Sequence, residues 1–304
     1  MREATSTTRG RELRSMLRGI REKTEYTGQD LARHLGWSPT KMSRIETGHQ
    51  PISEVDLTAY LAYCRVPGHQ MYKLLELARD AHNGYCVRGH DEPMPDQLRT
   101  LVVEETTACA IRDFELNYVP GLAQTEGYIR ALLHAGGVAR PAAIERWVQA
   151  RVDRQNLLKG CNPPECAFYI HEQALRIPVG GAAVMHEQML HLLFLDGRPH
   201  CSVRVVPTSA AAHGLCPSAF RIMEYADHLP VIYVETMTAS LFLENKKDSD
   251  AYQLKLGMLG RVALDEGRSR EFLVRLASEY DRVDEGDDEP TWSAEGDARR
   301  LAEE

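Results

Sequence analysis

The stretch LARHLGWSPTKMSRIETG, residues 31–48, constrains the fold most, because it predicts two short helices joined by a tight turn. Gly36 suits the turn, and the Ser38-Pro39 pair suits the start of the second helix, since serine caps helices and proline is tolerated at the first helical position. The apolar residues of both helices fall on one inward face: Leu31, Ala32, Leu35, Met42 and Ile45. We therefore expect a helix-turn-helix.

The outward positions of the second helix are polar or basic: Thr40, Lys41, Ser43 and Arg44. In a helix-turn-helix the second helix lies in the major groove and presents its N-terminal residues to base edges. Hydroxyl and guanidinium donors suit base edges and phosphates. A helical hairpin with an ordinary solvated face is the alternative, but the glycine turn, the caps and the local positive charge together favour binding of double-stranded DNA.

Helical patterns also flank this stretch. Residues 9–23 carry apolar positions on one face, and further helices are expected after Thr27, Ser53 and Pro67. Five short helices then make one all-α domain over residues 9–82. Residues 1–88 carry 14 Lys and Arg against 10 Asp and Glu, whereas the rest carries 22 against 34. A basic N-terminal region followed by an acidic remainder is consistent with a DNA contact confined to the N-terminal region.

Glycine, proline and charged residues dominate residues 83–96, which predicts a linker. Strand-like runs follow at 166–171, 202–207, 219–225, 231–236 and 240–245. Helical patterns occupy 98–115, 125–134, 142–159, 182–195, 248–266 and 269–280. Short loops between the strands favour a mainly antiparallel sheet backed by helices. We expect an α+β effector and dimerisation domain over residues 97–283 and a flexible acidic tail over residues 284–304.

Residues 9–80 resemble the phage-repressor-like, or XRE-type, helix-turn-helix domain, and the segment ending in SRIETG carries that resemblance. The resemblance implies phosphate contacts from Thr27 to Gln29. It also implies a structural ion pair between Arg21 and Glu46. Many relatives have glutamine at the position of Gly28, and Gln29 is the nearest substitute here. The residues expected to contact DNA are Thr27, Gln29, Ser38, Pro39, Thr40, Lys41, Ser43 and Arg44.

The remaining segments resemble the C-terminal domain of WhiJ-like regulators of actinobacteria, which are often labelled antitoxin-like. The resemblance rests on VPGLAQTEGYIRALL (119–133), ARVDRQNLL (150–158), EQALRIPVGG (172–181), SVRVVPTSAAAHGL (202–215) and VIYVET (231–236). It implies a regulator that is often accompanied by a small acidic partner protein.

Four residues are candidates for contacts with a ligand or partner. Gln124 follows a Pro-Gly turn, for which a purely structural role is at least as good an interpretation. Arg151 and Arg154 are three residues apart on a predicted helix, where they suit either an anion or an ordinary surface salt-bridge face. His213 lies in a loop of small residues after a strand.

No metal, cofactor or catalytic site is expected. HEQMLH places His186 and His191 five residues apart, whereas a zinc protease needs two histidines four apart on one helix face. The absence of a long apolar run or a signal-peptide core argues for a cytoplasmic protein with no membrane contact.

The sequence favours a DNA-binding transcriptional regulator whose C-terminal domain dimerises and senses a small-molecule effector or docks a partner. Homodimers are expected because one small domain makes few base contacts. The alternative is an antitoxin-like module that neutralises a small protein and autoregulates its own promoter. An enzyme with an appended DNA-binding domain ranks last.

Overall fold

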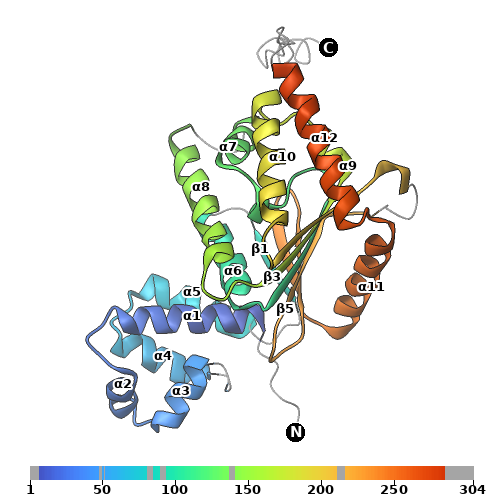
Figure 1. Ribbon diagram of the computed structural model, residues 1–304. Helices are drawn as coiled ribbons and strands as arrows, with labels where there is room; N and C mark the ends of the chain where they lie inside the picture. Colours follow the sequence, from blue (N-terminus) through green and yellow to red (C-terminus); the bar gives the residue numbers. More distant parts are fainter. Residues whose placement is uncertain are drawn as a thin grey trace, which may run out of the picture.

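A computed structural model describes residues 7–47, 50, 52–80, 85–89, 94–136, 141–210 and 216–284. A small helical bundle, residues 8–80, lies beside a larger unit in which helices cover a sheet (Figure 1). The predicted combination of an all-α helix-turn-helix region with an α+β domain is therefore confirmed. His213 and residues 285–304 of the predicted tail lie outside the described residues.

The helical bundle contains the five predicted helices: α1 (Thr8–Glu22), α2 (Gly28–His34), α3 (Pro39–Thr47), α4 (Glu54–Tyr63) and α5 (Gly68–Asp80). Thr27 and Asp30 form a capping box at the start of α2, and the Ser53 hydroxyl caps α4. The helices close around fully buried side chains that include Leu17, Leu31 and Leu57. Local caps and one shared apolar core therefore suffice to specify this unit.

A largely buried polar contact ties α1 to α3. Arg21 Nε and Nη2 of α1 donate to the two carboxylate oxygens of Glu46 in α3, at 2.7 and 3.0 Å. The Tyr60 hydroxyl lies 2.8 Å from the same Glu46 carboxylate and 3.1 Å from the Leu17 carbonyl oxygen. The hydrogen bond with Glu46 raises the pKa of Arg21. The ion pair implied by the resemblance is thus present, and it fixes α3 relative to α1.

The α+β domain is built on one mixed sheet of seven strands in the order β1-β7-β6-β5-β2-β3-β4. Four neighbouring pairs are antiparallel, whereas β2-β3 and β3-β4 are parallel, which confirms a mainly antiparallel sheet. The strands are β1 (Tyr85–Gly89), β2 (Ala110–Glu115), β3 (Glu165–His171), β4 (Cys201–Val206), β5 (Phe220–Glu224), β6 (Val231–Glu235) and β7 (Ala239–Leu243).

Helices cover both faces of the sheet. They are α6 (Met94–Thr107), α7 (Glu126–Ala135), α8 (Pro141–Arg154), α9 (Glu172–Arg176), α10 (Ala182–Asp196), α11 (Lys246–Val262) and α12 (Glu266–Asp284), with 3-10 turns η1 (Gly121–Ala123) and η2 (Gln155–Lys159). On one face, α10 and α12 pack against Phe168 and Val205. On the other, α11 packs against Ile222 and Ile232. Figure 1 shows α11 apart from the other helices.

Several predicted boundaries differ from the structure. The helix expected over 98–115 ends at Thr107, and its last third is β2, because Ala110–Glu115 pair with both β3 and β5. Within the expected linker, residues Tyr85–Gly89 form β1 and pair with β7. The helix expected over 142–159 ends at Arg154 and continues as η2. All five expected strands are present.

Replacing Arg21 with alanine is expected to destabilise the bundle by about 3 kcal/mol, because it leaves the largely buried Glu46 carboxylate without its cation. Base preference should change little, since Arg21 lies in the bundle and not on its outward α3 face. Thermal unfolding of the two proteins measures the effect. The matched control is Arg18→Ala on the same helix, which removes an exposed pair with Glu22 and should cost less than about 0.5 kcal/mol. Equal melting of wild type and Arg21→Ala would contradict the structural role.

Candidate nucleic-acid interface

The corner between α2 and α3 depends on a backbone conformation that favours glycine. Gly36 has a φ of +67°, in the left-handed region. The Trp37 amide then donates to the Ala32 carbonyl at 2.8 Å, which closes the turn. Ala32 and Met42 are buried beneath this corner. The turn therefore holds α3 against α2 at a fixed angle and leaves the opposite side of α3 exposed.

Four of the predicted DNA-contact residues form the exposed side of α3: Pro39, Thr40, Ser43 and Arg44. Ser38 is also exposed, and its hydroxyl accepts from the Lys41 amide at 3.1 Å, so it caps the helix. Within the described part of the chain, no carboxylate forms an ion pair with Arg44. Its guanidinium is thus available for an external acceptor.

Lys41 differs from its neighbours. Its ammonium lies 2.9 Å from the Asp56 carboxylate of α4 and 4.4 Å from the centre of the Trp37 ring. These contacts hold the side chain against the bundle in the absence of DNA. Sequence patterns do not indicate this pairing, because Asp56 belongs to another helix. Lys41 would have to leave Asp56 before it reached a base or a phosphate.

The N-terminus of α2 presents Thr27 and Gln29, which are both exposed. The Thr27 hydroxyl accepts from the Asp30 amide at 3.2 Å, and its own proton is directed to the Asp30 carboxylate at 2.5 Å. The hydrogen bonds that the Asp30 carboxylate accepts from the Thr27 hydroxyl and the Thr27 amide lower the pKa of Asp30. Gln29 is therefore freer than Thr27 to contact a phosphate at this end of the helix.

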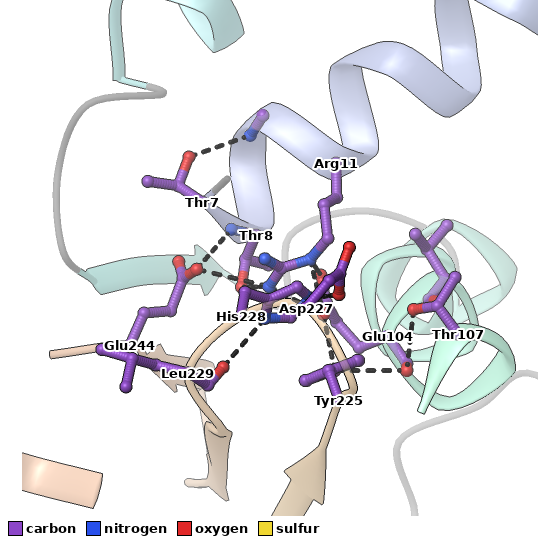
Figure 2. Close-up of polar contacts among 12 residues, drawn as sticks. Thr7, Thr8, Arg11, Glu104, Thr107, Tyr225, Asp227, His228, Leu229 and Glu244 are labelled. Atoms are coloured by element: carbon purple, nitrogen blue, oxygen red, sulfur yellow. Dashed lines mark hydrogen bonds and ion pairs between the residues drawn. The ribbon is translucent and has the colours of Figure 1, made fainter. Parts of the chain in front are cut away.

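The bundle is joined to the α+β domain by a buried arginine. Arg11 of α1 donates from Nε to both carboxylate oxygens of Glu104 in α6, at 3.0 and 2.9 Å, as Figure 2 shows. Its Nη2 atom reaches Glu244, just after β7, at 3.3 Å. The Thr8 amide donates to the same Glu244 oxygen at 2.6 Å. Glu104 is fully buried, so this contact is shielded from solvent.

Aromatic residues complete this junction. The Tyr225 hydroxyl donates to Glu104 at 2.7 Å, and its ring centre lies 5.4 Å below the Arg11 guanidinium. The His228 ring lies against Tyr225, with 3.9 Å between ring centres and a tilt of 31° between the ring planes (Figure 2). Burial opposes the charge on Arg11, but the Glu104 carboxylate raises the pKa of Arg11 overall. The junction therefore consists of a charged pair stabilised by hydrogen bonds from both sides.

The next residue of α6 makes a second buried ion pair inside the α+β domain. Glu105 contacts Arg221 of β5, and Arg221 also contacts Asp113 of β2. Arg154 of α8 lies 3.3 Å from Glu105. Adjacent residues on a helix point about 100° apart. Helix α6 consequently directs Glu104 towards α1 and Glu105 towards the sheet.

The candidate ligand residues of the α+β domain are not brought together as one site. Gln124 is buried and donates to the Val119 carbonyl at 2.7 Å, so it stabilises the turn before α7. Arg154 is also buried, which excludes the surface salt-bridge face expected for this pair. Arg151 lies one helical turn before Arg154 and is partly buried. Only the two arginines remain candidates among the residues that the structure describes.

Comparison with known families agrees with this division. A model described as a helix-turn-helix domain matches residues 12–74. A model described as a domain of unknown function, DUF5753, matches residues 98–275, more than half of the chain. The chain belongs to the DUF5753 family. The N-terminal region is accordingly a helix-turn-helix domain, a DNA-binding module, and Glu104, Glu105, Arg151 and Arg154 lie within the DUF5753 domain.

Other comparisons add little. No curated protein matches the sequence. Among solved structures, the chain is similar to TrmBL2, described as an archaeal chromatin protein with a novel mode of DNA binding. The TM-score is 0.30 at 9% identity, over 75% of this chain and 71% of that chain. A likeness of this size supports no conclusion about the DUF5753 domain. None of the described helices is both long and apolar enough to cross a membrane.

Arg44→Ala is expected to weaken binding to a preferred duplex by about 1–3 kcal/mol and to relax preference at one base pair, as for loss of a bidentate guanine contact. Fluorescence anisotropy on a duplex selected in vitro, and on a scrambled duplex, measures both effects. Arg275→Ala, which removes an exposed charge from α12, is the control and should bind as wild type does. An equal loss on both duplexes would assign Arg44 to a phosphate.

Proposed function

We propose that this protein is a sequence-specific transcription regulator of the XRE type, in which the DUF5753 domain sets the position of the helix-turn-helix. The exposed side of α3 supports this most directly, because donors cover a helix whose opposite side is fixed by Gly36, Met42 and the Arg21–Glu46 pair. Such a helix has the features required for reading a major groove. The basic N-terminal region and the acidic remainder agree with one localised DNA contact.

The proposal includes homodimer formation through the DUF5753 domain. A single small helix-turn-helix makes few base contacts, and two of them on half-sites about 34 Å apart bind cooperatively. It also includes regulation by a small effector, since a domain of this size exceeds what is needed to support five short helices. The proposal further places the protein among the WhiJ-like, antitoxin-like regulators of actinobacteria. These regulators are often accompanied by a small acidic partner protein.

Direct binding by the full-length protein tests the DNA-binding proposal. Selection from a random duplex library should yield one preferred sequence, and its affinity should fall steeply as salt increases, because phosphate contacts release counterions. Selection of a sequence with two-fold symmetry would indicate a dimer. Equal affinity for all duplexes would refute sequence-specific regulation, while leaving the fold unaffected.

The Arg11–Glu104 contact is expected to keep the bundle on the DUF5753 domain. Glu104→Gln removes the carboxylate charge but keeps a similar shape, so Arg11 loses its nearer carboxylate and retains Glu244 at 3.3 Å. The contact should weaken by about 3 kcal/mol, as for other broken buried pairs. Calorimetry should then show separate unfolding of the helix-turn-helix and the DUF5753 domain where the wild type shows coupled unfolding.

Glu145→Gln is the matched control. Glu145 is an exposed partner of Arg130, so its loss should cost less than about 1 kcal/mol and leave coupled unfolding intact. If Glu104→Gln also unfolds as wild type does, the junction does not hold the two parts together.

A further inference from the structure

Two cysteines lie side by side in the sheet of the DUF5753 domain. Cys166 of β3 and Cys201 of β4 are Cα partners in the parallel β3-β4 pair. The Cys166 amide donates to the His200 carbonyl at 2.7 Å, as the parallel hydrogen-bond pattern requires when Cys166 is opposite Cys201. Neighbouring strands lie about 4.8 Å apart, and opposed residues point to the same face. The register therefore holds the two side chains next to each other.

The pair lies on the sheet face that α10 and α12 cover. Residues two apart on a strand share a face, so Cys166 lies beside Phe168 and Cys201 beside Val203. All four belong to one buried apolar cluster, together with Leu192 of α10. A single buried cysteine serves well as a small apolar side chain. Two opposed thiols differ from a single one, because their sulfurs can react with each other.

The register also meets the main geometric requirement of a disulfide. The Cα atoms of a disulfide usually lie about 4.4–6.8 Å apart, and the two Cβ atoms must not point away from each other. The strand spacing of about 4.8 Å falls within that range. No other two cysteines are partners in the register of the described strands. The Cys166–Cys201 pair is therefore the place in the sheet where a link can form with little movement of the backbone.

The two sulfurs differ in their access to solvent. Cys201 is the first residue of β4, which is an edge strand, and it is 8% exposed. Cys166 is 3% exposed, on a strand with a neighbour on each side. The ends of edge strands open locally at a lower free energy than the centre of a sheet. A small solute therefore reaches Cys201 more easily than Cys166.

The surrounding groups favour Cys201 as the first thiol to react. A hydrogen bond from Cys166 lowers the pKa of Cys201, and the Arg198 charge also lowers it. Burial and the Asp196 carboxylate oppose these effects. The same hydrogen bond and burial raise the pKa of Cys166, whose sulfur also lies 3.6 Å from the Pro164 carbonyl oxygen. Since the thiolate is the nucleophile, Cys201 attacks first and Cys166 keeps its proton for a second step.

We propose that Cys166 and Cys201 form a redox-sensitive dithiol site whose co-substrate is a small peroxide. The Cys201 thiolate attacks one peroxide oxygen, the O–O bond breaks, and Cys201 becomes a sulfenic acid while the second oxygen leaves and is protonated to water. The Cys166 sulfur then attacks the Cys201 sulfur. The S–S bond forms as the sulfenic hydroxyl leaves with the Cys166 proton as a second water. Two thiols and one hydrogen peroxide thus give one disulfide and two waters.

Peptide mapping of the full-length protein tests the site. The reduced protein is treated with hydrogen peroxide at neutral pH, and the remaining thiols are then blocked with N-ethylmaleimide. Digestion without reductant should yield a peptide containing Cys166 joined to one containing Cys201, and dithiothreitol should separate them. The linked protein should melt several degrees above the reduced protein, because a link that fits the native structure restricts the unfolded chain.

Alanine variants separate the two steps without placing a new polar group in the core. In Cys166→Ala, Cys201 should accumulate a sulfenic acid that dimedone labels, whereas the wild type should show little label because Cys166 captures it. In Cys201→Ala, Cys166 should stay unoxidised at the same peroxide concentration. The matched control is Cys161→Ala, which removes an exposed thiol and should form the link as wild type does. Mapping of the wild type needs no variant, so it decides the question if a variant does not fold.

Three results would overturn the dithiol site. The first is a wild type in which Cys166 and Cys201 stay unlinked at a peroxide concentration that oxidises the exposed Cys109 and Cys161. The second is oxidation of Cys201 to a sulfinic acid without a link. The third is a linked protein that melts below the reduced one, because the sulfurs would then meet only after the strands had separated. DNA binding by the helix-turn-helix does not depend on any of these results.

Discussion

The contact on which the arrangement of this protein depends is the buried pair of Arg11 and Glu104. It joins residues 93 positions apart in the chain, and a fully buried carboxylate next to a nearly buried guanidinium is stable only while both are paired. Glu244, Tyr225 and Thr8 supply further hydrogen bonds to this pair. Because Glu104, Glu244 and Tyr225 come from different segments of the DUF5753 domain, moving the helix-turn-helix means breaking their contacts together.

Two adjacent glutamates of α6 connect the helix-turn-helix junction to the interior of the DUF5753 domain. Glu104 belongs to the junction, and Glu105 belongs to the charged cluster inside the DUF5753 domain. A buried cluster of this kind contributes little net stability compared with apolar packing. Such a cluster instead favours one arrangement of the surrounding elements over others, because each charged group accepts only a few partners. A regulator requires such discrete arrangements, whereas a purely structural domain would be served as well by leucine and phenylalanine.

Sequence patterns predicted the structure correctly where it depends on residues that are close together in the chain. The turn at Gly36, the caps at Thr27 and Ser53, and the five strands expected from alternating apolar residues are all present. Strand β2 was missed because Arg112 and Asp113 interrupt its apolar pattern, and Asp113 is buried only because Arg221 pairs with it across the sheet. The Lys41–Asp56 pair and the Arg11 junction were missed for the same reason. Contacts between distant charged residues leave no periodic signal in the chain.

Helix α1 belongs to both parts of the protein, and this has a mechanical consequence. Arg11 holds its first turns at the junction, while Arg21, ten residues later, is paired to α3 through Glu46. At 1.5 Å per residue, those two arginines are about 15 Å apart along the axis. A tilt of about 10° at the junction would therefore displace α3 by about 2.5 Å, close to the length of a hydrogen bond. Under the proposed function, a small rearrangement at Glu104 would therefore shift the exposed side of α3 relative to a bound duplex by about the same distance.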